Sequence, residues 1–168
     1  MEVIFMAIGD ALTSKSQLYG RDSVDLLART LWGETRGDSD SRVGVAYVIS
    51  NRKSNSTYNE FKNLNSIEAV VLAPNAFSCF NEGNPNLAEC LKPDTDSAAW
   101  KNIVSLASNL SSYSNPISGK CFYTANTRFS ELSYTSGNKL YYKFPGGSTV
   151  QVSSKIVVGG HTFFDYVV

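Results

Sequence analysis

The chain has 168 residues, 42% of them apolar, and its 15 Lys and Arg residues balance its 15 Asp and Glu residues. This length and apolar content predict one globular domain with a core of its own. The lack of a positive charge excess argues against a nucleic acid partner, and no apolar run approaches the ~18 residues of a membrane-spanning helix, so we expect no stable membrane insertion.

Residues 1–21 are expected to form an N-terminal extension that precedes a single domain over residues 22–168. The apolar stretch 3–9 is too short for the apolar segment of a signal peptide, follows Glu2 instead of a basic segment and stops at Asp10. We therefore expect no Sec-dependent export and synthesis in the cytoplasm.

The first predicted helix has Asp22 or Ser23 as its N-cap and Gly37 as a left-handed terminator. Apolar residues repeat at three- and four-residue spacing over 24–31, and Glu34 continues the same stripe. The Glu34 carboxyl is therefore predicted to point inward or into a cleft from the last turn of the helix.

Two effects would raise the pKa of Glu34 at such a place. The exposed carbonyls of a helix C-terminus disfavour a carboxylate, and partial burial beside Leu31 and Trp32 adds a desolvation cost. A raised pKa suits a general acid, although Arg36 would lower it again by pairing with Glu34. The alternative is a Glu that faces solvent at a frayed helix end.

Three further helices are predicted along the chain. They are a helix that has its cap among Asp38–Asp40 and ends at about Lys53, a helix over residues 66–72 with a capping box of Asn65 and Glu68, and a helix that starts at Asp94 or Thr95. Residues 75–93, which are rich in Asn, Gly and Pro, predict a long irregular segment of a kind that is often functional.

From Lys120 the chain changes to aromatic and β-branched residues, which favour strands. Residues 155–158 and 161–164 flank Gly159-Gly160 and predict a β-hairpin with a tight turn. The sequence thus predicts an α+β fold, with a helical first half and a small C-terminal antiparallel sheet.

Three blocks in this order, LLARTLWGETRGDSDSRVGVAYVISNR, SIEAVVLAPNAFSCFNEG and KIVVGGHTFFD, resemble the SleB/CwlJ-type cell wall hydrolase family, which includes spore cortex-lytic enzymes. Matching residues include Leu27, Ala28, Arg29, Gly33, Glu34, Arg36, Gly37, Asn51, Arg52, Pro74, Ala76, Phe77, Ser78, Gly159, His161 and Phe163. The chain departs from the family pattern at Thr35, Asp38 and Ser41-Arg42. The resemblance implies a lysozyme-like fold, a single catalytic domain over residues 22–168 and a catalytic acid at Glu34.

The resemblance also implies cleavage of peptidoglycan between N-acetylmuramic acid and N-acetylglucosamine. Glycoside cleavage ordinarily needs two carboxylates, and none of the candidates for a second one lies on an apolar stripe. These candidates are Asp38, Asp40, Glu60, Glu82 and Glu89. A lytic transglycosylase needs a single Glu and gives 1,6-anhydro products, so we expect this reaction. The alternatives are a muramidase or glucosaminidase that uses a second carboxylate and water, and a non-catalytic wall-binding or virion domain.

Other residues are expected to bind the substrate. They are Arg36, Asn51, Phe77, Ser78, Tyr123, Asn126 and His161. Phe77 and Ser78 follow Pro74, where a lysozyme-like fold would carry a sugar-binding hairpin, and polar-tipped aromatic rings such as Tyr123 suit sugar faces. Tyr123 could equally be a packed residue of the sheet, and His161, the sole histidine, is expected to have a supporting role at the cleft.

An odd number of cysteines, Cys79, Cys90 and Cys121, leaves at least one thiol free, and three reduced thiols are favoured over a Cys79 to Cys90 disulfide. No CxxC or HxxxH spacing supports a metal site, so we expect neither metal nor cofactor. A domain of this kind resembles a phage-type endolysin or a virion lysin. By this analogy we expect a monomer that is made in the host cytoplasm and acts on peptidoglycan glycan strands. It would reach the wall either through holin-dependent access or as part of a virion.

Overall fold

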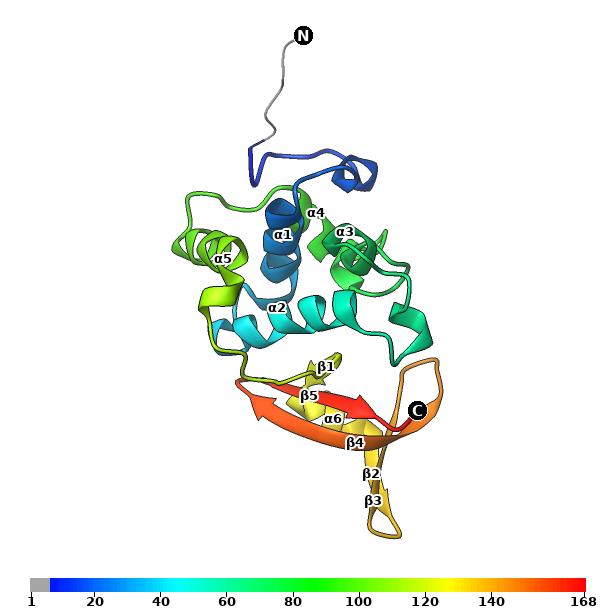
Figure 1. Ribbon diagram of the computed structural model, residues 1–168. Coiled ribbons are helices and arrows are strands. Elements are labelled where there is room, and N and C mark those ends of the chain that lie inside the picture. Colours follow the sequence, from blue (N-terminus) through cyan, green and yellow to red (C-terminus); the bar gives the residue numbers. More distant parts are fainter. Residues whose placement is uncertain (1–6) are drawn as a thin grey trace.

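The computed structural model describes residues 7–168, with helices in the first part of the chain and an antiparallel sheet at its end (Figure 1). The helices before the sheet are α1 (Ser23–Thr35), α2 (Ser39–Ser54), α3 (Ile67–Val71), α4 (Asn86–Leu91) and α5 (Ala98–Ser108). The later elements are β1 (Phe122–Ala125), α6 (Asn126–Leu132), β2 (Ser133–Ser136), β3 (Lys139–Lys143), β4 (Thr149–Val158) and β5 (His161–Tyr166). Short 3-10 helices lie at Lys15–Leu18, Asn59–Phe61, Ser78–Phe80 and Leu110–Ser112. The predicted α+β class, with helices first and the sheet last, is confirmed.

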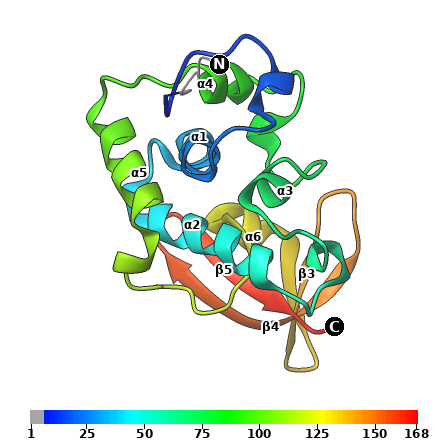
Figure 2. The same cartoon turned by 45° about the horizontal axis from the view of Figure 1, so that its top comes forward.

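Helix α1 is the centre of the helical half. It contacts α2, α3, α4 and α5, and Figure 2 shows it nearly end-on among them. Its fully buried side chains Leu26 and Leu31 belong to the main hydrophobic core together with Ile103 of α5. This packing explains the apolar stripe seen in the sequence, since a helix surrounded by others must be apolar around most of its circumference.

The boundaries of α1 are close to the predicted ones. The Asp22 carboxylate caps the helix by accepting a hydrogen bond from the backbone N–H of Val24. The prediction that Gly37 is left-handed was wrong, because Gly37 has no positive φ. The Asp38 N–H instead donates to the Thr35 carbonyl, and Asp38 in turn caps α2 through the Ser41 N–H. Thr35 therefore ends α1 in a turn that leads straight into α2, and no left-handed residue is needed.

Two predicted helix starts were displaced. The side chain that caps α3 is Ser66, which accepts from the Ala69 N–H, and not Asn65. Helix α5 begins at Ala98 with Ser97 as its cap, because the Ser97 N–H and hydroxyl both donate to the Asp94 carbonyl and close a separate turn first.

The segment 75–93 is less irregular than predicted. It holds the 3-10 helix Ser78–Phe80 and helix α4, both of which contact α1. The buried side chains Leu87, Cys90 and Leu91 of α4 supply the apolar contacts that order this part of the chain.

The sheet has the strand order β1-β5-β4-β3-β2, and every neighbouring pair is antiparallel. Val158 pairs with His161 across the turn Gly159-Gly160, which confirms the predicted hairpin. Gly159 has a φ of 57°, a conformation that favours glycine. One face of the sheet carries a second cluster of buried aromatic side chains, which includes Phe122, Phe129, Tyr142 and Phe164.

Helix α2 joins the two halves, since it contacts α1 and α3 on one side and β1 and β4 on the other (Figure 1). A Cβ atom on Gly44 would lie 2.6 Å from the ring of Phe163, so the helix and the sheet approach each other closely at this glycine. Near the other end of α2, the Arg52 guanidinium donates to the Cys121 carbonyl just before β1. These contacts fix the sheet against the helices.

The described part of the predicted extension packs on α1. Leu12 and Leu18 belong to the main core, and the Gly9 N–H donates to the buried carboxylate of Asp25. Arg21 and Arg29 also bind this carboxylate, at 2.6 and 2.7 Å. The domain boundary at residue 22 stays a prediction, and most of the apolar stretch 3–9 lies outside the described residues.

Candidate active site

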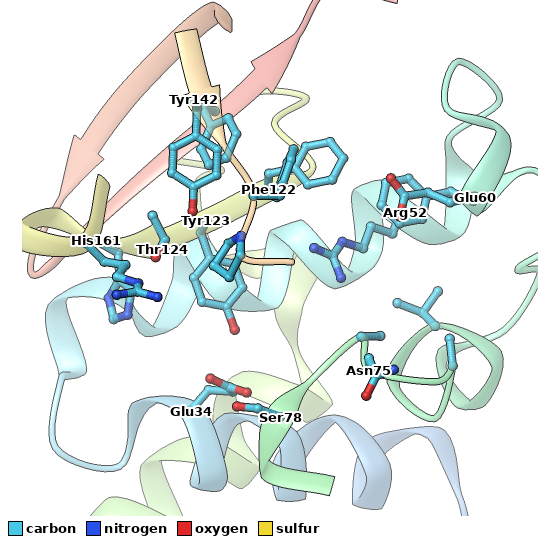
Figure 3. A pocket seen from close by; sticks show the side chains of 18 of the residues that line it. Glu34, Arg52, Glu60, Asn75, Ser78, Phe122, Tyr123, Thr124, Tyr142 and His161 are labelled. Atoms are coloured by element: carbon cyan, nitrogen blue, oxygen red, sulfur yellow. The ribbon is translucent and has the colours of Figure 1, made fainter. Parts of the chain in front are cut away.

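A cleft of about 950 Å³ lies where the helical half meets the sheet. Figure 3 shows Glu34, Ser78 and Asn75 on its helical side, with Tyr123, His161 and Tyr142 on its sheet side. Because the two walls come from distant parts of the chain, the sequence alone did not give the full set of residues that line the cleft.

Glu34 projects into this cleft from the last turn of α1, as its place on the apolar stripe predicted. Burial raises the pKa of its carboxyl above the ordinary value. Hydrogen bonds from the Cys79 thiol and the Tyr123 hydroxyl, together with the charges of His161 and Arg52, oppose this rise but do not cancel it. The result is a partly buried carboxyl that keeps its proton to a higher pH than an exposed Glu does and has the Cys79 thiol and the Tyr123 hydroxyl as neighbouring donors.

Tyr123 connects the sheet to the helix that carries Glu34. It stands on β1, and its ring meets His161 at 5.5 Å and Phe163 at 5.8 Å between centroids. Burial, and secondly the charge of Glu34, raise the pKa of the Tyr123 hydroxyl well above its ordinary value, so it remains a hydrogen-bond donor. Tyr123 therefore both packs in the sheet and reaches the cleft.

Arg52 brings a buried cation to the same cleft. Its guanidinium lies 5.0, 5.2 and 5.6 Å from the ring centroids of Phe61, Phe77 and Phe122, and its Nε donates to the Cys121 carbonyl. These contacts fix a positive charge whose field reaches Glu34. Arg52 matched the family pattern but was not among the predicted site residues.

His161, at the start of β5, faces the cleft and is anchored from behind. Its Nδ1 lies 3.1 Å from Asp38 Oδ2 and 2.8 Å from Ser41 Oγ. Burial alone would raise the pKa of Asp38, but hydrogen bonds from the Ser41 hydroxyl and N–H lower it, with smaller contributions from His161 in its protonated form and from the Gly160 N–H. Asp38 is therefore an ionised carboxylate.

Four of the eight predicted site residues line the cleft together, namely Glu34, Ser78, Tyr123 and His161. Arg36 is not among the lining residues, because two residues beyond Glu34 the side chain leaves on another side of the chain. Its guanidinium donates to the Trp32 carbonyl and to Asn86 Oδ1. The open question of a Glu34 to Arg36 pair is thus answered, since Arg36 is bound to α4.

Asn51, Phe77 and Asn126 also lie outside the cleft lining. Asn51 donates to the carbonyls of Ser118 and Lys120, and Phe77 is buried beside Arg52. Asn126 donates to the Gly159 carbonyl and accepts from the Thr162 hydroxyl. These three side chains support the walls of the cleft, and their predicted contact with substrate remains a prediction.

Of the five candidates for a second carboxylate, only Glu60 lines the cleft. Figure 3 shows it apart from Glu34, and its charge acts on the Arg52 guanidinium. Asp38 is engaged by His161, while Asp40, Glu82 and Glu89 are exposed elsewhere.

The cleft also contains residues that sequence reasoning missed. Asn75, whose backbone has a positive φ of 59°, supplies a polar amide at the rim of the cleft. Arg128 and Tyr142 line the cleft from the sheet side. The dipeptide Pro74-Asn75 was a turn signal that could have pointed to Asn75, because Asn tolerates this conformation better than most residues. Arg128 and Tyr142 carry no local signal.

Within residues 7–168 no group of three or more His, Cys, Asp or Glu side chains could hold a metal ion. All three cysteines are free and buried. In the same part of the chain, no helix has the length and apolar character needed to cross a membrane.

The fold and this cleft agree with what sequence comparison finds. The chain belongs to the cell wall hydrolase family, whose sequence profile matches residues 37–164. The matched range begins three residues after Glu34, so the match establishes the family without itself assigning a catalytic residue. No curated protein sequence matches the chain.

Two solved structures are similar to the chain. One is the catalytic domain of the germination-specific lytic transglycosylase SleB from Bacillus anthracis, at 21% identity and a TM-score of 0.49, with 88% of this chain and 98% of that chain covered. The other is the catalytic domain of the Bacillus cereus SleB protein, at 20% identity and a TM-score of 0.49, with 88% and 94% covered. The family match carries the assignment, and by it the protein is an enzyme that degrades the bacterial cell wall.

Proposed function

We propose that the protein is a peptidoglycan lytic transglycosylase that cleaves between N-acetylmuramic acid and N-acetylglucosamine, with Glu34 as its catalytic acid. The observation that carries this proposal is the Glu34 carboxyl itself, which lines the cleft with a raised pKa. A carboxyl that keeps its proton toward neutral pH can protonate a glycosidic oxygen.

The reaction then proceeds in two steps. Glu34 gives its proton to the glycosidic oxygen, and the bond from this oxygen to the anomeric carbon of the muramic acid breaks, with its electrons staying on the oxygen. The C6 hydroxyl oxygen of the same sugar bonds to the anomeric carbon, and its proton passes to the Glu34 carboxylate. The product is a 1,6-anhydro sugar, and Glu34 is ready for another cycle.

The surroundings of Glu34 favour the loss of its proton in the first step. When the carboxyl gives up its proton, the Tyr123 hydroxyl and the Cys79 thiol donate hydrogen bonds to the carboxylate. The fixed charge of Arg52 favours the same ionised form. Donors that are held in place before the reaction stabilise developing charge without reorganisation.

The sheet side of the cleft suits a glycan strand. Phe122, Tyr142 and Phe144 present aromatic surface there, Arg128 supplies a polar group on the same side, and Asn75 supplies one from the helical side. Aromatic faces with a few polar groups bind the apolar faces and the N-acetyl and hydroxyl groups of sugars. We propose that the strand lies along this wall with its scissile bond at Glu34.

A hydrolase that uses two carboxylates is the competing reaction, and Glu60 is its candidate for the second one. The test compares the turnover of purified peptidoglycan by Glu34→Gln, Glu60→Gln and Glu82→Gln, the last being an exposed control. We expect Glu34→Gln to lose about 10²- to 10⁴-fold in rate while the other two stay within about threefold of the wild type. Activity of Glu34→Gln within tenfold of the wild type would refute the catalytic role. An equal loss in Glu60→Gln would establish the two-carboxylate hydrolase.

The biological setting is a separate proposal that rests on the family analogy. We propose a monomeric phage-type endolysin or virion lysin that reaches the wall with a holin or within a virion. Size-exclusion chromatography of the purified chain tests the monomeric state, and elution as a dimer would contradict it.

A further inference from the structure

The side chains around His161 define which of its two ring nitrogens carries hydrogen. Neutral imidazole has one N–H donor and one bare acceptor nitrogen, and its partners determine which is which. Nδ1 has two oxygen neighbours, Asp38 Oδ2 at 3.1 Å and Ser41 Oγ at 2.8 Å. The tautomer therefore depends on what these two oxygens can donate.

Neither oxygen has a proton to give to Nδ1. Asp38 is ionised, so its carboxylate can only accept. The Ser41 hydroxyl has one proton and donates it to Asp38 Oδ2, which leaves Ser41 Oγ as an acceptor on its other side. Nδ1 faces two acceptors, and must itself be the donor.

The backbone around His161 holds this arrangement firmly. A Cβ atom on Gly160 would lie 3.0 Å from Asp38 Oδ2, and one on Gly159 would lie 2.9 Å from Ser41 Oγ, so the hairpin turn sits directly on the start of α2. Behind the turn, the Asn126 N–H donates to the Gly160 carbonyl. The turn that carries His161 is therefore held from both sides.

We propose that Asp38 and Ser41 lock neutral His161 as its Nδ1–H tautomer, so that the bare Nε2 serves the cleft as a hydrogen-bond acceptor for an N–H or O–H group of the bound glycan. Nε2 makes no hydrogen bond within residues 7–168, and the ring lines the cleft. Most of the fixed polar groups around Glu34 are donors, namely the Tyr123 hydroxyl, the Cys79 thiol and the Arg52 guanidinium. An acceptor among these donors gives the site a way to select the donor groups that a sugar carries.

Asp38 and Ser41 are positioning residues in this scheme, because they act through His161. The proposal rests on the proposed function for the identity of the ligand, whereas the tautomer follows from the protein alone. The two parts can therefore fail separately.

The first measurement is the long-range 1H–15N correlation spectrum of the imidazole at a pH where it is neutral. His161 is the sole histidine in the chain, so its signals need no assignment by mutation. We expect a protonated Nδ1 and a bare Nε2 in the wild type. A spectrum with Nε2 protonated would overturn the proposal without any variant being made.

The second measurement uses Asp38→Asn, which keeps the cap of α2 because Asn caps a helix as well as Asp. In the wild type the Ser41 N–H donates to Asp38 Oδ1, and in the variant it should donate to the side-chain oxygen of the Asn. The NH₂ group of the Asn then takes the place of Asp38 Oδ2 and faces Nδ1 of His161. Nδ1 must then accept, and the hydrogen moves to Nε2. Asp40→Asn is the matched control, since it removes an exposed carboxylate from the same turn of α2.

Binding is measured by calorimetry on the Glu34→Gln background, so that the ligand is not consumed, with a purified tetrasaccharide of alternating N-acetylglucosamine and N-acetylmuramic acid. We expect Asp38→Asn to change the tautomer and to weaken binding by about tenfold to a hundredfold, because a donor then faces a donor. Asp40→Asn should leave both unchanged. A changed tautomer with unchanged affinity, or no binding by Glu34→Gln itself, would overturn the acceptor role. Wild-type activity in Glu34→Gln would instead refute the proposed function and leave the tautomer result standing.

Discussion

Gly33 is the residue at which a single methyl group should disturb the candidate site most. It precedes Glu34 in α1 and lies against the two buried thiols of Cys79 and Cys90. A Cβ atom there would lie 2.5 Å from Cys90 Sγ and 2.8 Å from both Cβ and Sγ of Cys79. Gly33→Ala would therefore force α1 away from the segment that carries Cys79, a hydrogen-bond donor to Glu34.

The expected magnitude follows from two opposing effects. Ala is favoured over Gly inside a helix by about 1 kcal/mol. Overpacking of a filled core costs about 1–3 kcal/mol. Because three atoms would lie within 2.8 Å of the new Cβ atom, we expect an overpacking cost in the upper part of this range, about 2–3 kcal/mol. The net loss is then about 1–2 kcal/mol, with a fall in the melting temperature of roughly 2–8 °C for a chain of this size. Activity should fall as well, because the Glu34 carboxyl moves.

Thermal and urea unfolding, with peptidoglycan turnover in parallel, would measure both effects. Gly37→Ala is the matched control, because a Cβ atom there would meet no other atom within 4 Å, and it should be neutral or slightly stabilising. The Cys90→Ala background removes the nearest sulfur, so Gly33→Ala should cost less in it than in the wild type. Equal stability of Gly33→Ala and the wild type would refute this account of the packing beneath Glu34.

Three further predictions concern other parts of the molecule. Asp25→Asn should lower the free energy of unfolding, measured with urea, by about 3–5 kcal/mol, because it leaves the buried guanidinium groups of Arg21 and Arg29 without their carboxylate. A loss below about 1 kcal/mol would contradict this prediction. Burial alone would raise the pKa of Asp25, but its hydrogen bonds from Arg29, Arg21 and Gly9 lower the pKa below 3.8. The contribution of Asp25 to the stability of the folded state should therefore be present above pH 3.8 and disappear as the pH falls through the folded-state pKa. The pKa of Glu34 is raised above 4.5, so the initial rate of turnover should fall as the pH rises through the folded-state pKa of this carboxyl. The folded state should lose stability as the pH rises through the same range. Thermal unfolding of Glu34→Gln should not show this loss. EDTA and mild reductant should leave turnover nearly unchanged, and loss with EDTA that one metal restores would show a site that this account lacks.

The features predicted well from the sequence depend on local patterns. The stripe over 24–31 predicted that Glu34 would point inward or into a cleft, and Gly159-Gly160 predicted the β4–β5 hairpin. Helix and strand periodicity and tight turns are encoded by neighbouring residues. The overall α+β order followed from the same kind of signal.

The features that were missed depend on contacts between distant residues. The pairing of Asp38 with His161 joins residues 123 positions apart, and nothing in the local sequence of either residue indicates it. The same holds for Arg52, whose aromatic neighbours come from three separate segments, and for Arg36, whose partner Asn86 lies on α4. Side-chain geometry of this kind is set by the tertiary fold.

The products released from purified sacculi test the central claim most directly. Mass spectrometry of the soluble glycan should show fragments that end in 1,6-anhydro-muramic acid, with no new reducing ends, and Glu34→Gln should release none of them. New reducing ends from the wild-type protein would contradict the account, because water would then be the nucleophile and a second carboxylate would be required.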